Sequence, residues 1–138
     1  MNPKIITRPD VDIEEDIRHL IRSYDPLKQA QHHVHYTVSD GHVILQGHVR
    51  SVQAHRVLID NVPDIEGVVR VNADGLFDDE TVRLEIGQVV PAGVIVRVNY
   101  GHVVLTGPQS PDIDPGVLVP KVQAVPGVIP EHVTTSFY

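Results

Sequence analysis

The ten residues Val38-Ser-Asp-Gly-His-Val-Ile-Leu-Gln-Gly47 decide the fold, because they return sixty positions later as Val98-Asn-Tyr-Gly-His-Val-Val-Leu-Thr-Gly107. Six of the ten positions are identical. The same offset relates Leu58 to Leu118 and Gly67 to Gly127. A fixed offset over such a length indicates that the chain contains an internal repeat.

The repeat continues upstream with a changed offset of 69. The apolar series Ile13, Ile17, Leu20 and Ile21 then aligns with Val82, Ile86, Val89 and Val90. The nine-residue difference falls between the first helix and the first strand. There the first copy has residue 22 and the loop at residues 23–33, whereas the second has only residues 91–93. Insertions are tolerated in surface loops, so residues 23–33 are predicted to form a loop.

The first copy predicts the element order αββαβ. Apolar residues at helical spacing over 13–21 predict an amphipathic helix, with Asp12 as its N-cap and Glu15 as the capping-box partner. Alternating apolar residues over 34–49 predict a β-hairpin that turns at Asp40-Gly41. Ser51 is predicted to cap a second helix, and residues 68–73 are predicted to form the third strand.

The second copy repeats this order with a poorer second helix. Its hairpin covers residues 94–107, but that helix has Pro120 near its second turn, where proline costs about 3 kcal/mol. A short or broken helix is therefore predicted. Pro130 is predicted to lie in the last strand, which would then be an edge strand or have an outward-facing nitrogen.

The predicted fold class is α+β, with two tandem αββαβ modules, at residues 11–77 and 78–138. Each module is expected to be a three-stranded mixed sheet packed with two helices, and the second is degenerate. The join at residues 73–79 is short, so the modules are expected to touch.

These motifs resemble the BON domain. The resemblance rests on Asp40-Gly41-His42-Val43-Ile44-Leu45-Gln46-Gly47 with Gly67-Val68, and on Gly101-His102-Val103-Val104-Leu105-Thr106-Gly107 with Gly127-Val128. It covers nearly the whole chain twice, and the first copy fits better because Tyr100 replaces the turn Asp in the second. If one module is the binder, we expect it to be the first.

The resemblance implies a non-enzymatic binding or adaptor protein. Members of the family are typically bacterial and are associated with stress response, envelope integrity and phospholipid contact. Similar αββαβ units build secretin-type rings, so a self-assembling structural protein is the alternative function. The implied partners are a phospholipid surface, another protein or further copies of the chain.

Six repeated glycines are predicted to be structural, because tight turns and close backbone approaches use glycine routinely. They are Gly41, Gly47, Gly67, Gly101, Gly107 and Gly127.

Charge disfavours nucleic acid as a partner. The chain has 11 basic and 18 acidic residues, a net charge of −7, whereas phosphate binding needs clustered Lys and Arg. The densest basic group is Arg18, His19 and Arg22, with Lys28 in the segment that follows. This group is the candidate ligand or membrane surface, and a solvated helix face is the alternative.

Histidine is the one unusual component, with nine residues. His33 and His35 lie on one face of the first predicted strand, and His48 on the paired strand could join them as ligands of a transition metal. A solvent-facing polar surface and a pH-sensing surface remain alternatives. No fourth ligand is evident, so no bound metal is predicted.

The sequence predicts neither an enzyme nor a cofactor. No Gly-x-Ser-x-Gly, phosphate-binding glycine loop or His-Glu-x-x-His motif is present, and cysteine is absent. The first ten residues lack the apolar segment of an export signal. A cytoplasmic protein is therefore expected, or a periplasmic one if the chain is a mature fragment.

Overall fold

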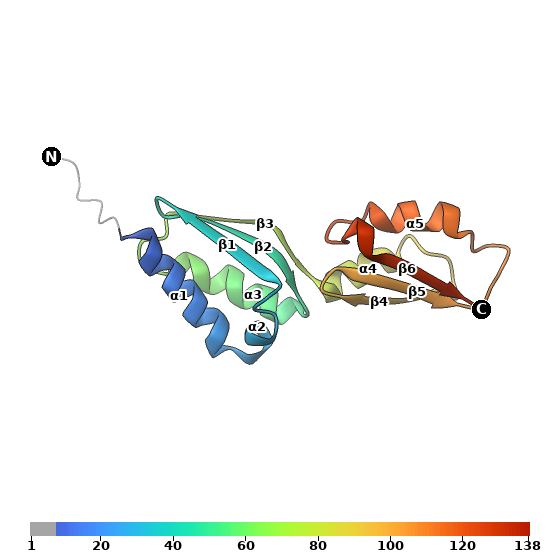
Figure 1. The fold of residues 1–138 in the computed structure, drawn as a ribbon, viewed down its shortest axis with the longest axis horizontal. Helices are drawn as coiled ribbons and strands as arrows, with labels where there is room; N and C mark the ends of the chain where they lie inside the picture. Colours follow the sequence, from blue (N-terminus) through green and yellow to red (C-terminus); the bar gives the residue numbers. More distant parts are fainter. Residues whose placement is uncertain (1–7) are drawn as a thin grey trace.

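A computed structural model describes residues 8–138, so most of the segment searched for an export signal lies outside the described residues. The chain forms two similar modules that lie end to end (Figure 1). The first module comprises α1 (Asp10–Ser23), α2 (Asp25–Gln29), β1 (Val34–Ser39), β2 (His42–Val49), α3 (Val52–Asn61), η1 (Val62–Asp64) and β3 (Arg70–Asp78). The second comprises α4 (Asp79–Gly87), β4 (Ile95–Asn99), β5 (His102–Gly107), α5 (Pro115–Gln123), η2 (Pro130–His132) and β6 (Val133–Phe137).

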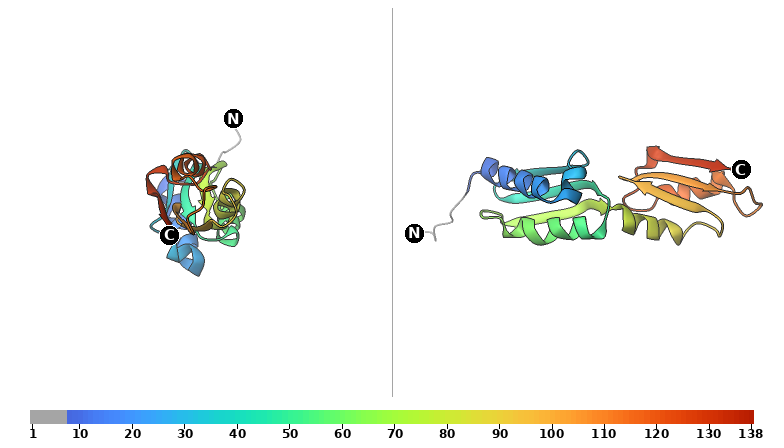
Figure 2. Two further views of the ribbon diagram at one scale, coloured as in Figure 1. Left: turned by 90° about the vertical axis from the view of Figure 1, so that its right-hand side faces the viewer. Right: turned by 90° about the horizontal axis from the view of Figure 1, so that it is seen from below.

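Each module contains a three-stranded mixed sheet, which confirms the predicted α+β class. In the first sheet β2 lies in the centre, antiparallel to β1 and parallel to β3. In the second sheet β5 takes the same place between β4 and β6. The helices α1 to α3 lie below the first sheet in Figure 1, whereas α5 lies above the second. The end-to-end arrangement is also clear from below (Figure 2).

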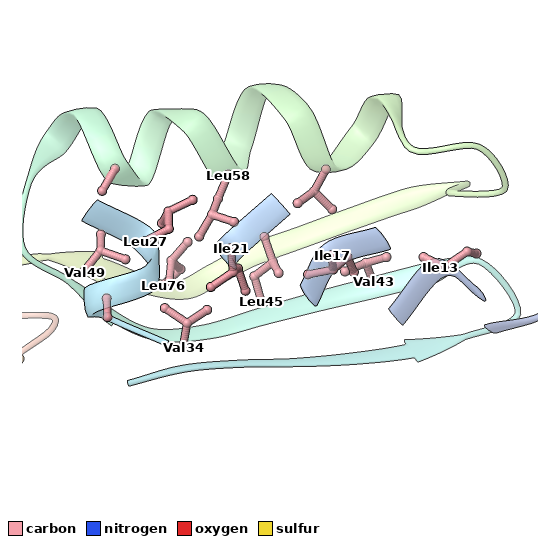
Figure 3. Packing of buried hydrophobic residues seen from close by; sticks show 13 residues of the cluster. Ile13, Ile17, Ile21, Leu27, Val34, Val43, Leu45, Val49, Leu58 and Leu76 are labelled. Carbon is pink, nitrogen blue, oxygen red and sulfur yellow. The ribbon is translucent and has the colours of Figure 1, made fainter. Parts of the chain in front are cut away.

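Alternation along β2 separates the core from the open face of the first sheet. Val43 and Leu45 are buried against the helices, whereas His42, Ile44 and Gln46 are exposed. Figure 3 shows Ile13, Ile17 and Ile21 of α1 in the same apolar layer, below Leu58 of α3. The second module has a separate and smaller core. Its buried members are Val82, Ile86, Val98, Val103, Leu105, Leu118, Val122, Val125 and Val128.

The predicted start of the first helix is wrong. Helix α1 begins at Asp10, and its N-cap position is Pro9, which makes no side-chain capping bond. The carboxylate of Asp10 instead accepts hydrogen bonds from the backbone nitrogens of Asp40 and Gly41. The first turn of the helix therefore holds the hairpin turn. The predicted Ser51 cap is confirmed, because its Oγ accepts a bond from the nitrogen of Ala54.

The loop predicted at residues 23–33 contains a helix. Helix α2 begins with Asp25-Pro26, and both Leu27 and Ala30 are fully buried. The segment therefore contributes to the core of the first module, and the second module has no counterpart.

Helix α5 is not broken at Pro120. It runs without interruption over nine residues, with Asp114 as a side-chain N-cap and Pro115 in its first turn. Proline removes one hydrogen bond there, but Leu118 and Val122 are buried on the same helix, and such packing supplies most helix stability.

The third strands also differ from prediction. Strand β3 extends to Asp78 and contains an irregularity opposite residues 44–46 of β2, so most of the predicted join is strand. Pro130 lies in η2, before β6. Strand β6 is nevertheless at the edge of its sheet. Of the helices described between residues 8 and 138, none has the length and apolar character needed to span a bilayer.

Replacing Leu27 by Ala tests whether α2 belongs to the core. We expect the free energy of unfolding of the first module to fall by about 2–5 kcal/mol, because the change leaves a cavity at a fully buried site. Chemical denaturation followed by NMR signals of the first module measures the loss. Leu84→Ala, at a leucine that is 63% exposed, is the control and should leave stability nearly unchanged. Equal effects of the two substitutions would contradict a core role for α2.

Candidate functional site at the module joint

The two modules meet with no linker between them. Asp78 is the last residue of β3 and also the N-cap of α4, where its carboxylate accepts a bond from the nitrogen of Thr81. The preceding residue, Phe77, belongs to the first sheet but packs against the core of the second module. The expectation that the modules touch is confirmed by this packing and by the contacts described below.

Asp79 is the central charged group of the joint. Its side chain is only 5% exposed, and the carboxylate accepts bonds from the backbone nitrogens of Tyr100, at 2.7 Å, and Gly101, at 3.1 Å. Asp10 binds the first hairpin turn in the same way, so both modules use a carboxylate in the first turn of a helix to hold a hairpin turn. Only Asp79 also forms an ion pair across the joint, with Arg50 Nε at 3.1 Å. One buried carboxylate thus ties the second hairpin turn to the first module.

Tyr100 presents an aromatic surface to the first module. It lies in the hairpin turn with a φ of 50°, and its ring stacks on the imidazole of His33 with centroids 3.7 Å apart and planes 4° apart. The guanidinium of Arg50 lies over the same ring, 5.4 Å from its centroid. The ring therefore makes both a stacking and a cation–π contact with the first module.

His48 makes a directional bond to the second module. Its Nε2 donates to the backbone oxygen of Gly127 over 2.8 Å. A Cβ at Gly101 would lie 2.5 Å from that Nε2 and 3.0 Å from the same oxygen, and Gly101 has a φ of 81°. Only glycine fits there without strain, because the turn is left-handed and the neighbouring module is close.

Further polar bonds also cross the joint. Arg50 donates to the side-chain oxygen of Asn99 over 2.9 Å. The carboxylate of Glu80, in the first turn of α4, accepts a bond from the nitrogen of Val52 in the first turn of α3. This bond satisfies one of the free N–H groups at the start of α3.

The joint residues distinguish the two copies. His33, His48 and Arg50 lie at one end of the first module, and the repeat places Gly93, Pro108 and Ser110 at the equivalent end of the second. Tyr100, Asn99 and Glu80 correspond in the same way to Asp40, Ser39 and Val11. Except for Asp79 and Phe77, which the repeat aligns with Asp10 and Phe137, the side chains that bind across the joint are therefore replaced by others at the two outer ends. Positions at which the two copies carry different residues are therefore the signal in the sequence that could have located the joint.

The structure does not bring the candidate metal ligands together. His33 stacks on Tyr100, His48 binds Gly127, and His35 lies on the exposed face of β1 opposite Gln46. Between residues 8 and 138, no group of three or more His, Cys, Asp and Glu is arranged to hold a metal ion. Two of the three histidines therefore contact the second module.

The surroundings of His33 favour its neutral form. Burial lowers the pKa of His33 below its usual value, and the nearby imidazoles of His102, His32 and His48 lower it further, whereas Asp79 raises it. Protonation would place a positive charge against the Tyr100 ring at the joint.

The candidate ligand surface on the first helix is exposed. Arg18, His19 and Arg22 lie on the outer side of α1, and Lys28 lies on α2. Arg18 forms an exposed ion pair with Glu15.

The six repeated glycines all have positive φ values, between 79° and 154°. Gly47 also approaches the backbone closely, since a Cβ there would lie 1.9 Å from the oxygen of His33.

The comparisons agree with a BON domain in the first module. The family model described as BON domain matches residues 9–76. That match does not include the second module, whose membership stays a prediction although its fold repeats the first. No curated protein matches the chain.

The solved structures that match the chain include two of the protein CdsD. The C-terminal domain of CdsD, the structural protein of the Type III secretion system of Chlamydia trachomatis, has a TM-score of 0.67 and 21% identity. The likeness covers 95% of this chain and 66% of that chain, and at this identity it shows a shared fold. A second CdsD structure, also from Chlamydia trachomatis, has a TM-score of 0.35 and 16% identity over 92% of this chain and 93% of that one, and a score this low does not show a common fold.

Asp79→Asn and Asp10→Asn separate the joint from the hairpin turn. Each substitution removes the charge that accepts two backbone bonds, and we expect each to lower the stability of its own module by about 1–3 kcal/mol. Only Asp79→Asn should also change NMR chemical shifts at Arg50 and His33 in the other module. Similar shifts in both variants would contradict a joint role for Asp79.

The pKa of His33 should depend on the second module. A lowered pKa means that the neutral, stacked form is complete above about pH 6.5 and that its contribution to the joint is lost as the pH falls through the lowered value. An NMR titration of the His33 ring should therefore give a value below about 6.5. The substitution Tyr100→Ala removes the ring that covers His33 and should therefore raise the pKa of His33. The same pKa in both proteins would contradict this account.

Proposed function

We propose that this chain, whose residues 9–76 match the BON domain, is a non-enzymatic scaffold that binds other macromolecules with its two modules held at a fixed spacing. The observation that carries the proposal is the joint. A flexible pair of binding domains would need only a linker, whereas here β3 runs directly into α4 and a buried carboxylate spans both modules. A fixed spacing matters to a partner that contacts both modules together.

Two further observations support a scaffold. The fold is shared with a structural protein of a secretion system, and that role enters here as part of the proposal. Each described sheet also leaves one face open, with Ile44 and Val104 exposed at equivalent positions. Such faces offer contact area to another protein. The stress- or envelope-related setting of the family belongs to the same proposal.

A protein partner is favoured over an anionic membrane. Arg18, Arg22 and Lys28 are exposed, but α1, which carries the two arginines, also carries Glu14, Glu15 and Asp16, and Arg18 is paired. Attraction to anionic lipid needs several basic groups without such neighbours. Phospholipid contact at this surface is therefore the secondary proposal, and self-assembly is the alternative.

Opening the joint tests the proposal. The double variant Arg50→Ala, Tyr100→Ala removes the ion pair, the stacking, the cation–π contact and the packing of Tyr100 against the first core, while the buried residues of both cores stay in place. When immobilised and exposed to extract of the source cells, it should retain a partner of the native chain at least about tenfold less, because the partner loses simultaneous contact with both modules. The control is Arg56→Ala, Tyr138→Ala, at exposed positions outside the joint, which should retain the partner fully.

Two measurements separate the alternatives. Sedimentation over a concentration series detects self-assembly, and co-sedimentation with vesicles of anionic and neutral phospholipid detects lipid binding. The scaffold proposal predicts a captured protein that is lost with the joint. Equal retention by the native chain and the joint variant, or no capture by either, would contradict it.

A further inference from the structure

The free end of the second module contains an open groove. It lies between the residues that follow α4 and the first half of α5 and has a volume of about 390 Å³. Its apolar lining is made by Val89, Val90, Pro91, Val117 and Leu118. Val117 is 54% exposed and Val89 is 39% exposed, so apolar surface remains open to solvent.

The first module fills the equivalent place with α2. The repeat aligns Val90 with Ile21 and Leu118 with Leu58, and α2 lies in the nine-residue segment that the second copy lacks. Leu27 of α2 is fully buried in the same cluster as Ile21 and Leu58. Figure 3 shows Leu27 just below Leu58.

The second module lacks a further piece of cover. Helix α3 begins at Val52 and buries Ala54, whereas the position aligned with Ala54 is Asp114, the N-cap of α5. Helix α5 therefore starts about one turn later than α3. The missing turn and the missing α2 together leave the groove.

The charges at the groove favour a basic segment. Asp112 and Asp114 are exposed at its rim, against the single basic residue Lys121. In α2 the residue after the buried Leu27 is Lys28, which is exposed. A segment with an aliphatic residue followed by a basic one would match both the apolar lining and the acidic rim.

We propose that this groove binds a short helical segment of a partner protein, with a leucine-like side chain in the place that Leu27 occupies in the first module and a basic residue beside it. The chain's own α2 is not the occupant, because Leu27 is buried in the first core and Gln29 lies at the joint, with its backbone oxygen 3.5 Å from the Tyr100 hydroxyl. The inference goes beyond the scaffold proposal, since the groove belongs to the second module alone and would bind with the joint open or closed.

The peptide of residues 22–33 from the first module is the probe. Titrated into the full chain and followed by NMR, it should shift the signals of Val89, Val90, Val117 and Leu118. The matched peptide with Leu27→Asp should bind at least about tenfold more weakly, since it lacks the apolar anchor. Val117→Glu in the protein should weaken binding of the native peptide similarly, whereas Val69→Glu, at a valine 68% exposed in the first module, should not. Equal shifts with both peptides would overturn the proposal.

A graft tests the same fit within one chain. Replacing residues 91–93 with residues 22–33 restores the length of the first copy. The grafted segment should cover the groove, abolish the shifts caused by the peptide and raise the melting temperature relative to a graft carrying Leu27→Asp. Equal melting temperatures of the two grafts would overturn the proposal. Self-association of the native chain in a sedimentation series that is lost in the graft would also overturn it, because a second copy would then occupy the groove. The capture experiment with the variant Arg50→Ala, Tyr100→Ala tests the scaffold proposal and not the groove, so the two proposals can fail independently.

Discussion

The arrangement of the two modules depends on one buried carboxylate, that of Asp79. It lies in the first turn of α4, accepts two backbone bonds from the hairpin turn at Tyr100 and pairs with Arg50 of the first module. A buried charge is costly unless several partners satisfy it, so the hairpin, the helix and the neighbouring module have to stay in register around it. In the first module the carboxylate of Asp10 accepts the two equivalent turn bonds, at the end of that module that lies away from the joint (Figure 1).

The sequence predicted most of the fold, because the repeat and its periodicity report directly on strands and helices. It failed where tertiary contacts override local signals. Pro120 costs a helix bond, but buried Leu118 and Val122 keep α5 whole. Residues 23–33 look like a loop insertion, yet Leu27 makes them part of the core. Asp12 fits a capping box, although the helix begins at Asp10.

The site was harder to predict than the fold. Strand alternation places His33 and His35 on one face with His48 on the paired strand, and this pattern suits a metal site as well as a surface that contacts another module. The second module distinguishes these histidines, because His33 stacks on its Tyr100 ring and His48 donates a hydrogen bond to its Gly127, whereas His35 contacts neither. No local pattern reports on a partner surface that lies beyond the hairpin. The differences between the copies do report on it, because Tyr100, Asn99 and Glu80 are replaced by Asp40, Ser39 and Val11 at the outer end of the first module. The residues that the two copies share thus specify one fold twice. The residues that differ between the copies specify the joint between the modules and the uncovered groove.

The central claim is that the two modules move as one body, and residual dipolar couplings of the native chain test it most directly. Backbone amides of the first and second modules, measured in one weakly aligned sample, should fit a single alignment tensor with the orientation seen in Figures 1 and 2. Two tensors that differ in magnitude would mean that the modules reorient independently, and the fixed joint would be contradicted.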